Sequence, residues 1–412
     1  MHLHKLEGPW LAHPFWKKRF VIDSADDLKA LRSSGVSEIW VDDALGLDVG
    51  ATTAWAPPPA VTGNAIAVVA SPSLPGRPPL RRRGEEEPLQ AEMREAAAIC
   101  GRGRQAVTAM FNEVRMGRGV NAEQCLPLVE DITNSVARNP GAMVSLARLK
   151  TKDDYSYMHS VAVCALMVAL GRQLGMDDDD CRVAGLAGLA GLMHDIGKAL
   201  VPLEILNKPS RLTDKEFAQI RKHPEDGHQL LLEGASSHPA ALDVVPHHHE
   251  RFDGKGYPFG LAGEQISRLA RMGSLCDVYD AITSNRPYKA GWDPAESIAR
   301  MAGWKGQFDA PMFSALVQSL GIYPTGSLVR LESGHLAVAV AQNPGTLVAS
   351  VVKLFYSVKR ELPVTPQVVD LAGVGCPDRI VAREQRFPGQ FPWLDELWAD
   401  TDVLRRMNGS PD

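Results

Sequence analysis

Long apolar segments are missing from this sequence of 412 residues. No run reaches the roughly 18 apolar residues that a membrane-spanning helix requires, and the first residues lack the apolar stretch of a signal peptide. The six cysteines form no CxxC pair, which is typical of reduced residues in a cytosolic protein. With a net charge of −5, the chain also lacks the basic excess that bulk nucleic-acid binding needs. We therefore expect a globular, cytoplasmic protein without a membrane span.

A proline-rich stretch separates the two parts of the chain in which a core can form. Residues 56–88 are expected to be a flexible linker, because such a composition cannot pack a core. Before this linker, residues 1–55 are expected to form a small α+β domain. Its strands are predicted at residues 19–22 and 38–41, and its helix at residues 25–33.

After the linker, the pattern is helical over residues 89–325. Apolar side chains recur at intervals of three and four over residues 157–174, which predicts a helix. Capping boxes that begin at Thr213 and Asp293 predict two further helix starts. This region is therefore expected to be an all-helical domain.

The last part of the chain has a β-rich pattern. Strands are predicted at residues 327–331, 336–340 and 346–352, with turn residues between them. Residues 326–412 are expected to form a small β appendage and tail. The predicted fold class is mainly α, with a small N-terminal α+β unit and a small C-terminal β appendage.

Residues 191–198 read GLMHDIGK and place a histidine, a carboxylate and an amine at the end of an apolar helix. His194 and Asp195 are adjacent, and so are His248 and His249, so the members of each pair point about 100° apart on a helix. This geometry suits a dinuclear metal centre with a bridging carboxylate. Because imidazole and carboxylate occur here without thiolate, iron or manganese fits better than structural zinc.

Each of these residues has a more ordinary explanation when it is taken alone. A single histidine such as His159 is more often a hydrogen-bonded core residue than a ligand, and a His-Asp dipeptide is common. Lys198 alone would be a solvent-facing lysine beside a helix end, and the loop after His249 would be a structural turn. The combination of these residues indicates a metal-centred hydrolase.

Several motifs together resemble the HD-GYP family. Residues 248–258 read HHERFDGKGYP and match the HHExxDGxGYP signature of that family. The other matching elements are the HD pair at His194 and Asp195, the HPxxG element from His223 to Gly227, and the carboxylate block at 277–281. The resemblance covers residues 150–325. It implies the HD-superfamily fold and a metal-dependent phosphodiesterase that hydrolyses the bacterial second messenger cyclic di-GMP to pGpG, GMP or both.

The resemblance also implies metal ligands at seven positions, with Asp195 bridging the ions. These positions are His159, His194, Asp195, His223, His248, His249 and Asp277. Some family members hold a third ion with a glutamate one helical turn before the first histidine. Tyr155 stands there in this chain, and the neighbouring Asp154 would face away from His159. We therefore expect two divalent ions, iron or manganese.

The expected reaction is in-line attack on phosphorus by a hydroxide that bridges the two ions. Lys198 lies one turn from Asp195 and is expected to help the 3′ oxygen leave, so these two are the predicted catalytic residues. The resemblance implies that two segments bind the substrate. They contribute Arg286 and Lys289, which can bind phosphate, and Asp253, Gly256 and Tyr257 of the loop after the histidine pair.

Residues 5–16 resemble the domain of unknown function that precedes many HD-GYP domains. A short strand usually comes before this point in that family. We therefore expect either that the chain starts about ten residues late or that its first strand is missing, which would leave an exposed sheet edge. In the family, the GYP loop also contacts signalling proteins such as diguanylate cyclases, which implies similar partners here.

Three alternatives stay open on these residues. The chain could be a catalytically silent cyclic di-GMP receptor that signals through protein contacts, or an HD-superfamily phosphohydrolase on another nucleotide. Within the leading class, cyclic GMP-AMP could be the substrate. The complete ligand set argues against the receptor, and the GYP loop with Arg286 and Lys289 argues against the plain phosphohydrolase. The oligomeric state, including a homodimer, also stays open.

Overall fold

The computed structural model describes residues 2–7, 20–21, 38–42, 88–150, 155–176, 181–208, 210–234, 238–284, 291–343, 345–384, 391 and 393–407. It divides into two compact units, Met1–Ser73 and Leu74–Asp412. The predicted helix at 25–33 lies outside the described residues. So does the predicted linker, except for Pro88, which already belongs to a helix.

Three strands of the first unit are described. They are β1 (His2–Glu7), β2 (Phe20–Val21) and β3 (Glu38–Asp42), and they form an antiparallel sheet in the order β2-β1-β3. The strands predicted at 19–22 and 38–41 are confirmed. The strand β1 was not predicted. β1 pairs with β2 on one side and with β3 on the other. This first strand is therefore central in the described sheet and does not leave the exposed edge that a missing first strand would have caused.

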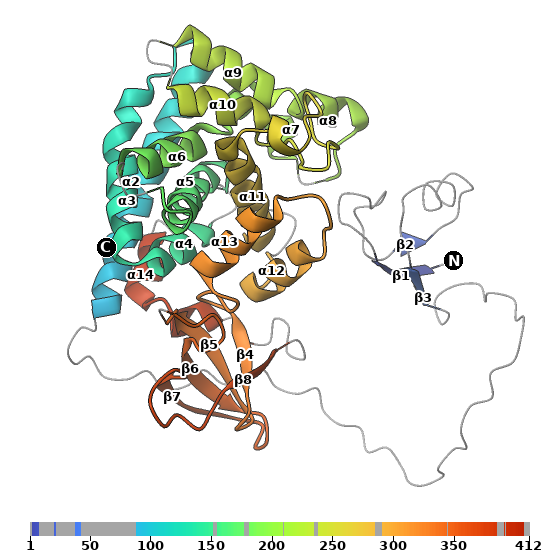
Figure 1. Ribbon diagram of the computed structural model, residues 1–412. Helices are drawn as coiled ribbons and strands as arrows, with labels where there is room; N and C mark the ends of the chain where they lie inside the picture. Colours follow the sequence, from blue (N-terminus) through green and yellow to red (C-terminus); the bar gives the residue numbers. More distant parts are fainter. Residues whose placement is uncertain are drawn as a thin grey trace, which may run out of the picture. The chain divides into compact units, whose positions relative to one another are not determined.

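The second unit is mainly helical, as predicted (Figure 1). Its helices before the C-terminal sheet are α2 (Pro88–Arg115), η2 (Ala122–Cys125), α3 (Leu126–Arg138), α4 (Pro140–Arg148), α5 (Tyr155–Gln173), α6 (Cys181–Met193), η3 (Ile196–Leu200), α7 (Leu203–Leu206), α8 (Asp214–Ile220), α9 (His223–Glu233), α10 (Pro239–His247), η4 (Gly263–Gln265), α11 (Arg268–Thr283), α12 (Pro294–Ala302) and α13 (Ala310–Leu320). The η elements are short 3₁₀ helices. Among the described residues, no helix combines the length and the apolar character needed to cross a membrane.

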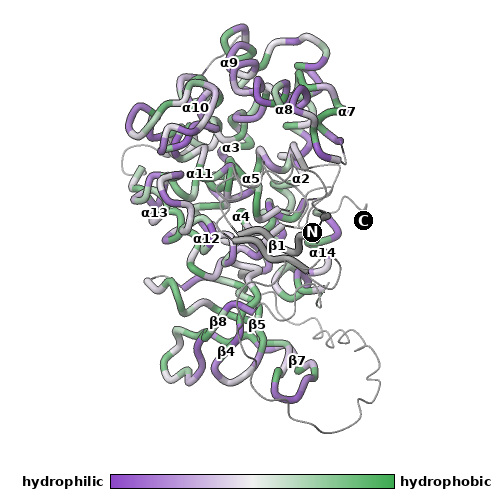
Figure 2. The backbone as a smooth tube through the Cα atoms, turned by 90° about the vertical axis from the view of Figure 1, so that its right-hand side faces the viewer, coloured by the Kyte–Doolittle hydropathy of each residue, from purple (hydrophilic) through white to green (hydrophobic). Residues whose placement is uncertain are grey.

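The helix α5 is the centre of the helical core. It packs against α2, α3, α4, α6, α11 and α13, and every residue from Met158 to Gly171 is buried. A helix that is apolar on all sides is stable only when other elements surround it. Figure 2 shows the hydrophobic colouring of this central helix.

Glycines in α6 let this helix approach α5 closely. A Cβ atom at Gly188 would lie 2.8 Å from the Val168 side chain, and one at Gly191 would lie 3.0 Å from the Val163 carbonyl oxygen. Real Cβ atoms do not come this close to their neighbours. The close packing brings the end of α6, which the HD pair follows, against the middle of α5.

Capping side chains explain where several helices start. Thr213 accepts a hydrogen bond from the Glu216 N–H and the Glu216 carboxylate accepts one from the Thr213 N–H, so the predicted capping box of α8 is confirmed. At α12, Asp293 accepts from the N–H groups of Ala295 and Glu296. The second half of the predicted box is absent there, because the Glu296 carboxylate pairs with Arg300 instead.

The C-terminal part forms a five-stranded antiparallel sheet at one end of the helical unit (Figure 1). Its strands are β4 (Leu328–Leu331), β5 (His335–Ala341), β6 (Val351–Ser357), β7 (Leu362–Asp370) and β8 (Ile380–Arg383), in the order β7-β6-β5-β4-β8. They are followed by η5 (Leu394–Leu397) and α14 (Thr401–Met407), which packs against α2.

Two of the three predicted strands, at 327–331 and 336–340, are confirmed as β4 and β5. The strand predicted at 346–352 is misplaced, because β6 begins only at Val351. The Asn343 side chain donates hydrogen bonds to the Ala349 carbonyl and to Asp370 and thereby closes a loop before that strand. The strands β7 and β8 were not predicted.

A second glycine contact holds η3 against the start of α9. A Cβ atom at Gly197 would lie 2.0 Å from the His223 carbonyl oxygen and 2.6 Å from the Gly227 nitrogen. We expect Gly197→Ala to lower the free energy of unfolding by about 1–3 kcal/mol, because the backbones would have to separate. Urea unfolding measures this change.

Gly101→Ala is the matched control, because Gly101 lies in α2 and a Cβ atom there would meet nothing within 4 Å. This control should keep or slightly raise the stability, since alanine favours helix by roughly 1 kcal/mol over glycine. Equal stability of the two variants would contradict the account of the contact between η3 and α9.

Candidate metal centre

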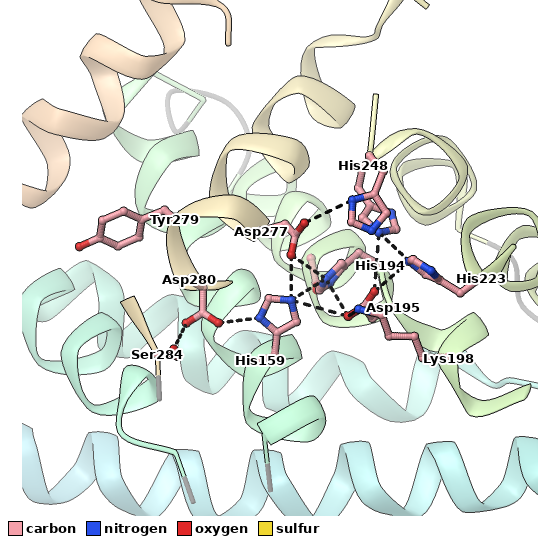
Figure 3. Close-up of polar contacts among 12 residues, drawn as sticks. His159, His194, Asp195, Lys198, His223, His248, Asp277, Tyr279, Asp280 and Ser284 are labelled. Atoms are coloured by element: carbon pink, nitrogen blue, oxygen red, sulfur yellow. Dashed lines mark hydrogen bonds and ion pairs between the residues drawn. The ribbon is translucent and has the colours of Figure 1, made fainter. Parts of the chain in front are cut away.

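Five segments of the helical unit converge on one buried site (Figure 3). His159 lies on α5, His194 and Asp195 follow α6, His223 begins α9, His248 and His249 follow α10, and Asp277 lies on α11. The structure thus brings together all seven residues that the sequence analysis predicted as metal ligands. Six of these residues are buried, and His249 is partly exposed.

The seven residues divide into two groups. Asp195, His223, His248 and His249 form one group, and His159, His194 and Asp277 form the other. In each group the potential ligand atoms lie within 4.8 Å of one another. This spacing is suited to one metal ion per group.

Asp195 lies between the two groups. Its Oδ1 atom is 3.2 Å from Nε2 of His223 and 3.6 Å from Nε2 of His248. Its Oδ2 atom is 3.4 Å from Nε2 of His194 and 3.6 Å from Nε2 of His159. One carboxylate oxygen therefore faces each group, which is the arrangement that a bridging carboxylate requires.

In three histidines, a backbone carbonyl determines which ring nitrogen carries the hydrogen. The Nδ1 atoms of His194, His223 and His248 lie 2.7, 2.7 and 2.8 Å from the carbonyl oxygens of Gly191, Ile220 and Val245. A carbonyl oxygen only accepts hydrogen bonds, so each Nδ1 carries the hydrogen. In the neutral rings, each Nε2 atom then offers a lone pair to the site.

These lone pairs face other nitrogen atoms at short distances. The Nε2 atoms of His223 and His248 are 3.1 Å apart, and those of His159 and His194 are 3.3 Å apart. His223 and His248 therefore bring two unprotonated nitrogens together, and these repel each other at this distance unless a cation lies between or beside them. Protonation does not supply that cation at His223, because burial lowers the pKa of this residue to about 4. At His159, Nε2 also lies 2.9 Å from Oδ1 of Asp277, and burial there is outweighed by the contacts with Asp277 and Asp280, which raise the pKa of this residue.

The remaining charges of the site also favour cations. Burial opposes ionisation of Asp195, but the Lys198 ammonium beside it is the main opposing influence, and the pKa of this carboxyl lies well below its usual range. Asp277 is likewise ionised, because contacts with His159 and other imidazoles outweigh burial and lower its pKa. Asp195 Oδ1 is buried and accepts no hydrogen bond from the described residues. Such an orphaned anionic oxygen is what a divalent ion would satisfy.

Lys198 reaches the site through Asp195. Its Nζ atom donates to Oδ2 of Asp195 at 2.5 Å, and its side chain is 20% exposed. Arg286 and Lys289, which were predicted to bind phosphate, lie outside the described residues, as do Asp154 and the side chain of Tyr155. Their roles stay predictions.

A buried layer behind the site was missed by the sequence analysis. Asp280 accepts a hydrogen bond from Nδ1 of His159 at 2.6 Å and forms an ion pair with the fully buried Lys150. Its other carboxylate oxygen accepts from the Ser284 hydroxyl at 3.1 Å. Asp277 and Asp280 are three residues apart on α11, so their shared helix face was the available signal. Contacts of this kind fix the orientation of a ligating imidazole.

The loop after the histidine pair is held by Glu250. This buried carboxylate accepts three hydrogen bonds from the backbone N–H groups of Phe259, Gly260 and Leu261. Gly256 fits into the resulting turn only without a side chain, because a Cβ atom there would lie 2.4 Å from the Arg251 nitrogen.

Two residues of this loop were predicted to bind substrate through their side chains. The Tyr257 ring stacks on His249, with centroids 4.7 Å apart and 27° between the ring planes. Asp253 pairs with the Arg251 guanidinium at 2.7 Å and accepts from the Lys255 N–H. Tyr257 therefore lies at the site, whereas the described contacts of Asp253 stabilise the loop itself.

Comparisons with known proteins relate the chain to hydrolases of this type. Residues 130–312 match the HD domain, and residues 1–125 match a domain of unknown function, DUF3391. The chain is 50% identical over 411 residues to the Pseudomonas aeruginosa protein named cyclic di-GMP phosphodiesterase PA4108, which covers 100% of this chain and 95% of that protein.

Two further relatives match a smaller part of the chain. The Xanthomonas campestris protein named cyclic di-GMP phosphodiesterase response regulator RpfG is 34% identical over 42% of this chain and 47% of its own length. The Vibrio cholerae protein named 3′3′-cGAMP-specific phosphodiesterase 1 is 32% identical over 43% of this chain and 41% of its own length.

The layer behind His159 predicts an effect on metal affinity. We compare two double variants, Lys150→Met with Asp280→Asn and Lys150→Met with Asp280→Leu, because neither leaves an unpaired buried charge. Asparagine can still accept the hydrogen bond from Nδ1 of His159, whereas leucine cannot. We expect the leucine variant to bind one metal ion about 10- to 100-fold more weakly than the asparagine variant. Titration against a competing chelator measures this difference, and equal affinities would contradict it.

The Glu250 contacts predict an effect on loop order. Glu250→Gln keeps the shape of the side chain but turns one acceptor into a donor that faces a backbone N–H group. We expect a loss of about 1–3 kcal/mol of stability and faster hydrogen exchange at Phe259, Gly260 and Leu261. Glu264→Gln is the control, since Glu264 is exposed in the following turn. Unchanged exchange in the Glu250 variant would refute this role.

Proposed function

We propose that this chain, which belongs to the HD-GYP family, hydrolyses cyclic di-GMP with the help of two divalent metal ions. The observation that carries this proposal is the pair of ligand groups with one oxygen of Asp195 facing each. The names of its relatives supply the substrate class, since the relative that matches its full length is called a cyclic di-GMP phosphodiesterase.

Each ion would be held by one ligand group. Asp195, His223, His248 and His249 would hold one ion, and His159, His194, Asp277 and the second oxygen of Asp195 would hold the other. The donor set contains imidazole and carboxylate but no thiolate, which suits iron or manganese. When bound, such ions polarise phosphoryl oxygens and lower the pKa of bound water.

The side chains around the ions would position the substrate. Lys198 lies beside Asp195, and its ammonium group would donate a hydrogen bond to the 3′ oxygen as this oxygen leaves. Arg286 and Lys289 would bind phosphate. Tyr257 would offer its hydroxyl to the substrate, while Gly256 would let the backbone approach it closely.

The loop that carries Tyr257 would also serve as a contact for protein partners such as diguanylate cyclases. Phe259 supports this part of the proposal, because this large apolar residue is 58% exposed in the same loop. A second candidate substrate is cyclic GMP-AMP, and the relative named 3′3′-cGAMP-specific phosphodiesterase 1 supports it.

The proposed activity is tested with protein purified without oxygen and loaded with manganese or iron. We expect it to convert cyclic di-GMP to pGpG or GMP, resolved by chromatography, with about two metal ions per chain. Asp195→Ala should lower the rate by more than about 100-fold. Loss of a residue that only orients a metal ligand already costs up to about this much, and Asp195 would be a ligand itself. The same samples are assayed with 3′3′-cyclic GMP-AMP.

Asp214→Ala serves as the control, because Asp214 is exposed at the start of α8 and makes no side-chain hydrogen bond with the described residues. It should keep full activity. Tight binding of cyclic di-GMP without turnover, under every metal tried, would refute the enzyme and make the protein a receptor. Faster turnover of cyclic GMP-AMP would instead favour the second substrate.

A further inference from the structure

Arg221 places an unused guanidinium group beside the metal centre. It directly follows α8, and its guanidinium carbon lies 4.4 Å from the centroid of the Tyr257 ring. Arg221 is exposed. Its side chain makes no hydrogen bond or ion pair with any residue that the structure describes, whereas Arg251, Arg271 and Arg330 each pair with a carboxylate.

Two connections link Arg221 to the ligand group that contains His223 and His249. It lies two residues before His223 in the chain, and the Tyr257 ring that it covers stacks on His249. A guanidinium group over an aromatic face keeps its N–H donors at its edges, where they can reach an anion. The arrangement therefore holds a cation at the margin of the site without using its donors.

Two lysines of the described site are already paired. Lys198 donates to Asp195, and Lys150 is buried against Asp280. An exposed arginine at this margin therefore has no described anionic partner within the protein, and a ligand can provide one.

The proposed substrate carries two phosphodiester groups on one ring. When one of them lies at the two metal groups, the other must be held elsewhere, and burying it without a cation would be unfavourable. Arginine is well suited to this task, because its planar fork can donate two hydrogen bonds to one phosphate.

We propose that Arg221 binds the phosphate of cyclic di-GMP that is not being cleaved. This inference rests on the proposed function, and it adds a binding residue that the motifs do not contain. Arg221 would act through direct contact with the substrate, with Tyr257 holding its guanidinium in place.

The test compares Arg221→Gln with the wild type on two substrates. We expect the KM for cyclic di-GMP to rise about tenfold, because a charge-assisted hydrogen bond is lost, with kcat nearly unchanged. Hydrolysis of bis(p-nitrophenyl) phosphate, which has only one phosphodiester group, should not change. Arg221→Lys should recover part of the loss, since lysine keeps the charge but not the fork.

Arg300→Gln is the matched control. Arg300 also lies over an aromatic ring, 4.3 Å from the centroid of Trp292, but it pairs with Glu296 on α12. This variant should leave the KM for both substrates unchanged. Circular dichroism of each variant checks that the fold is retained.

Two results would overturn the role of Arg221. One is an unchanged KM for cyclic di-GMP in Arg221→Gln. The other is an equal loss of activity on both substrates, which would mean that Arg221 acts only by supporting Tyr257 and His249.

Calorimetric binding of cyclic di-GMP separates this inference from the proposed function. If the wild type does not hydrolyse cyclic di-GMP, the proposed function fails, but the affinities still decide the role of Arg221. An affinity about tenfold lower in Arg221→Gln supports direct contact, and an equal affinity refutes it.

Discussion

The close approach of imidazole nitrogens that carry no hydrogen is the constraint on which the site depends. The Nε2 atoms of His223 and His248 lie 3.1 Å apart, and their Nδ1 atoms already donate to backbone carbonyls. Burial lowers the pKa of His223 to about 4, so a proton does not relieve the repulsion near neutral pH. A divalent ion held within their ligand group would relieve it and would also satisfy the orphaned oxygen of Asp195.

The fold can be understood as the means of holding these nitrogens together. Gly191 lets α6 approach α5, and Gly197 lets η3 approach α9, so that the segments carrying the ligands meet without intervening side chains. Behind them, the ion pair of Lys150 with Asp280 fixes the ring of His159. The apolar core supplies rigidity, and the low polarity that it creates strengthens every charge interaction within the site.

The resemblance to a known family predicts which residues meet at the site, and all seven residues that it implies as ligands lie together in the structure. It does not predict Lys150 as part of the site, since the contact with Asp280 joins residues 130 positions apart. The strand β7 was missed because it contains Pro363 and Pro366, which normally argue against a strand. Its place at the edge of the sheet explains why both prolines are tolerated there.

The most direct test of the dinuclear centre is an anomalous difference map from crystals of the manganese-loaded protein. Two peaks about 3.5–4 Å apart, with Asp195 between them and one ligand group around each, are the predicted result. A single peak, or peaks away from Asp195, in crystals of protein that hydrolyses cyclic di-GMP would contradict the account.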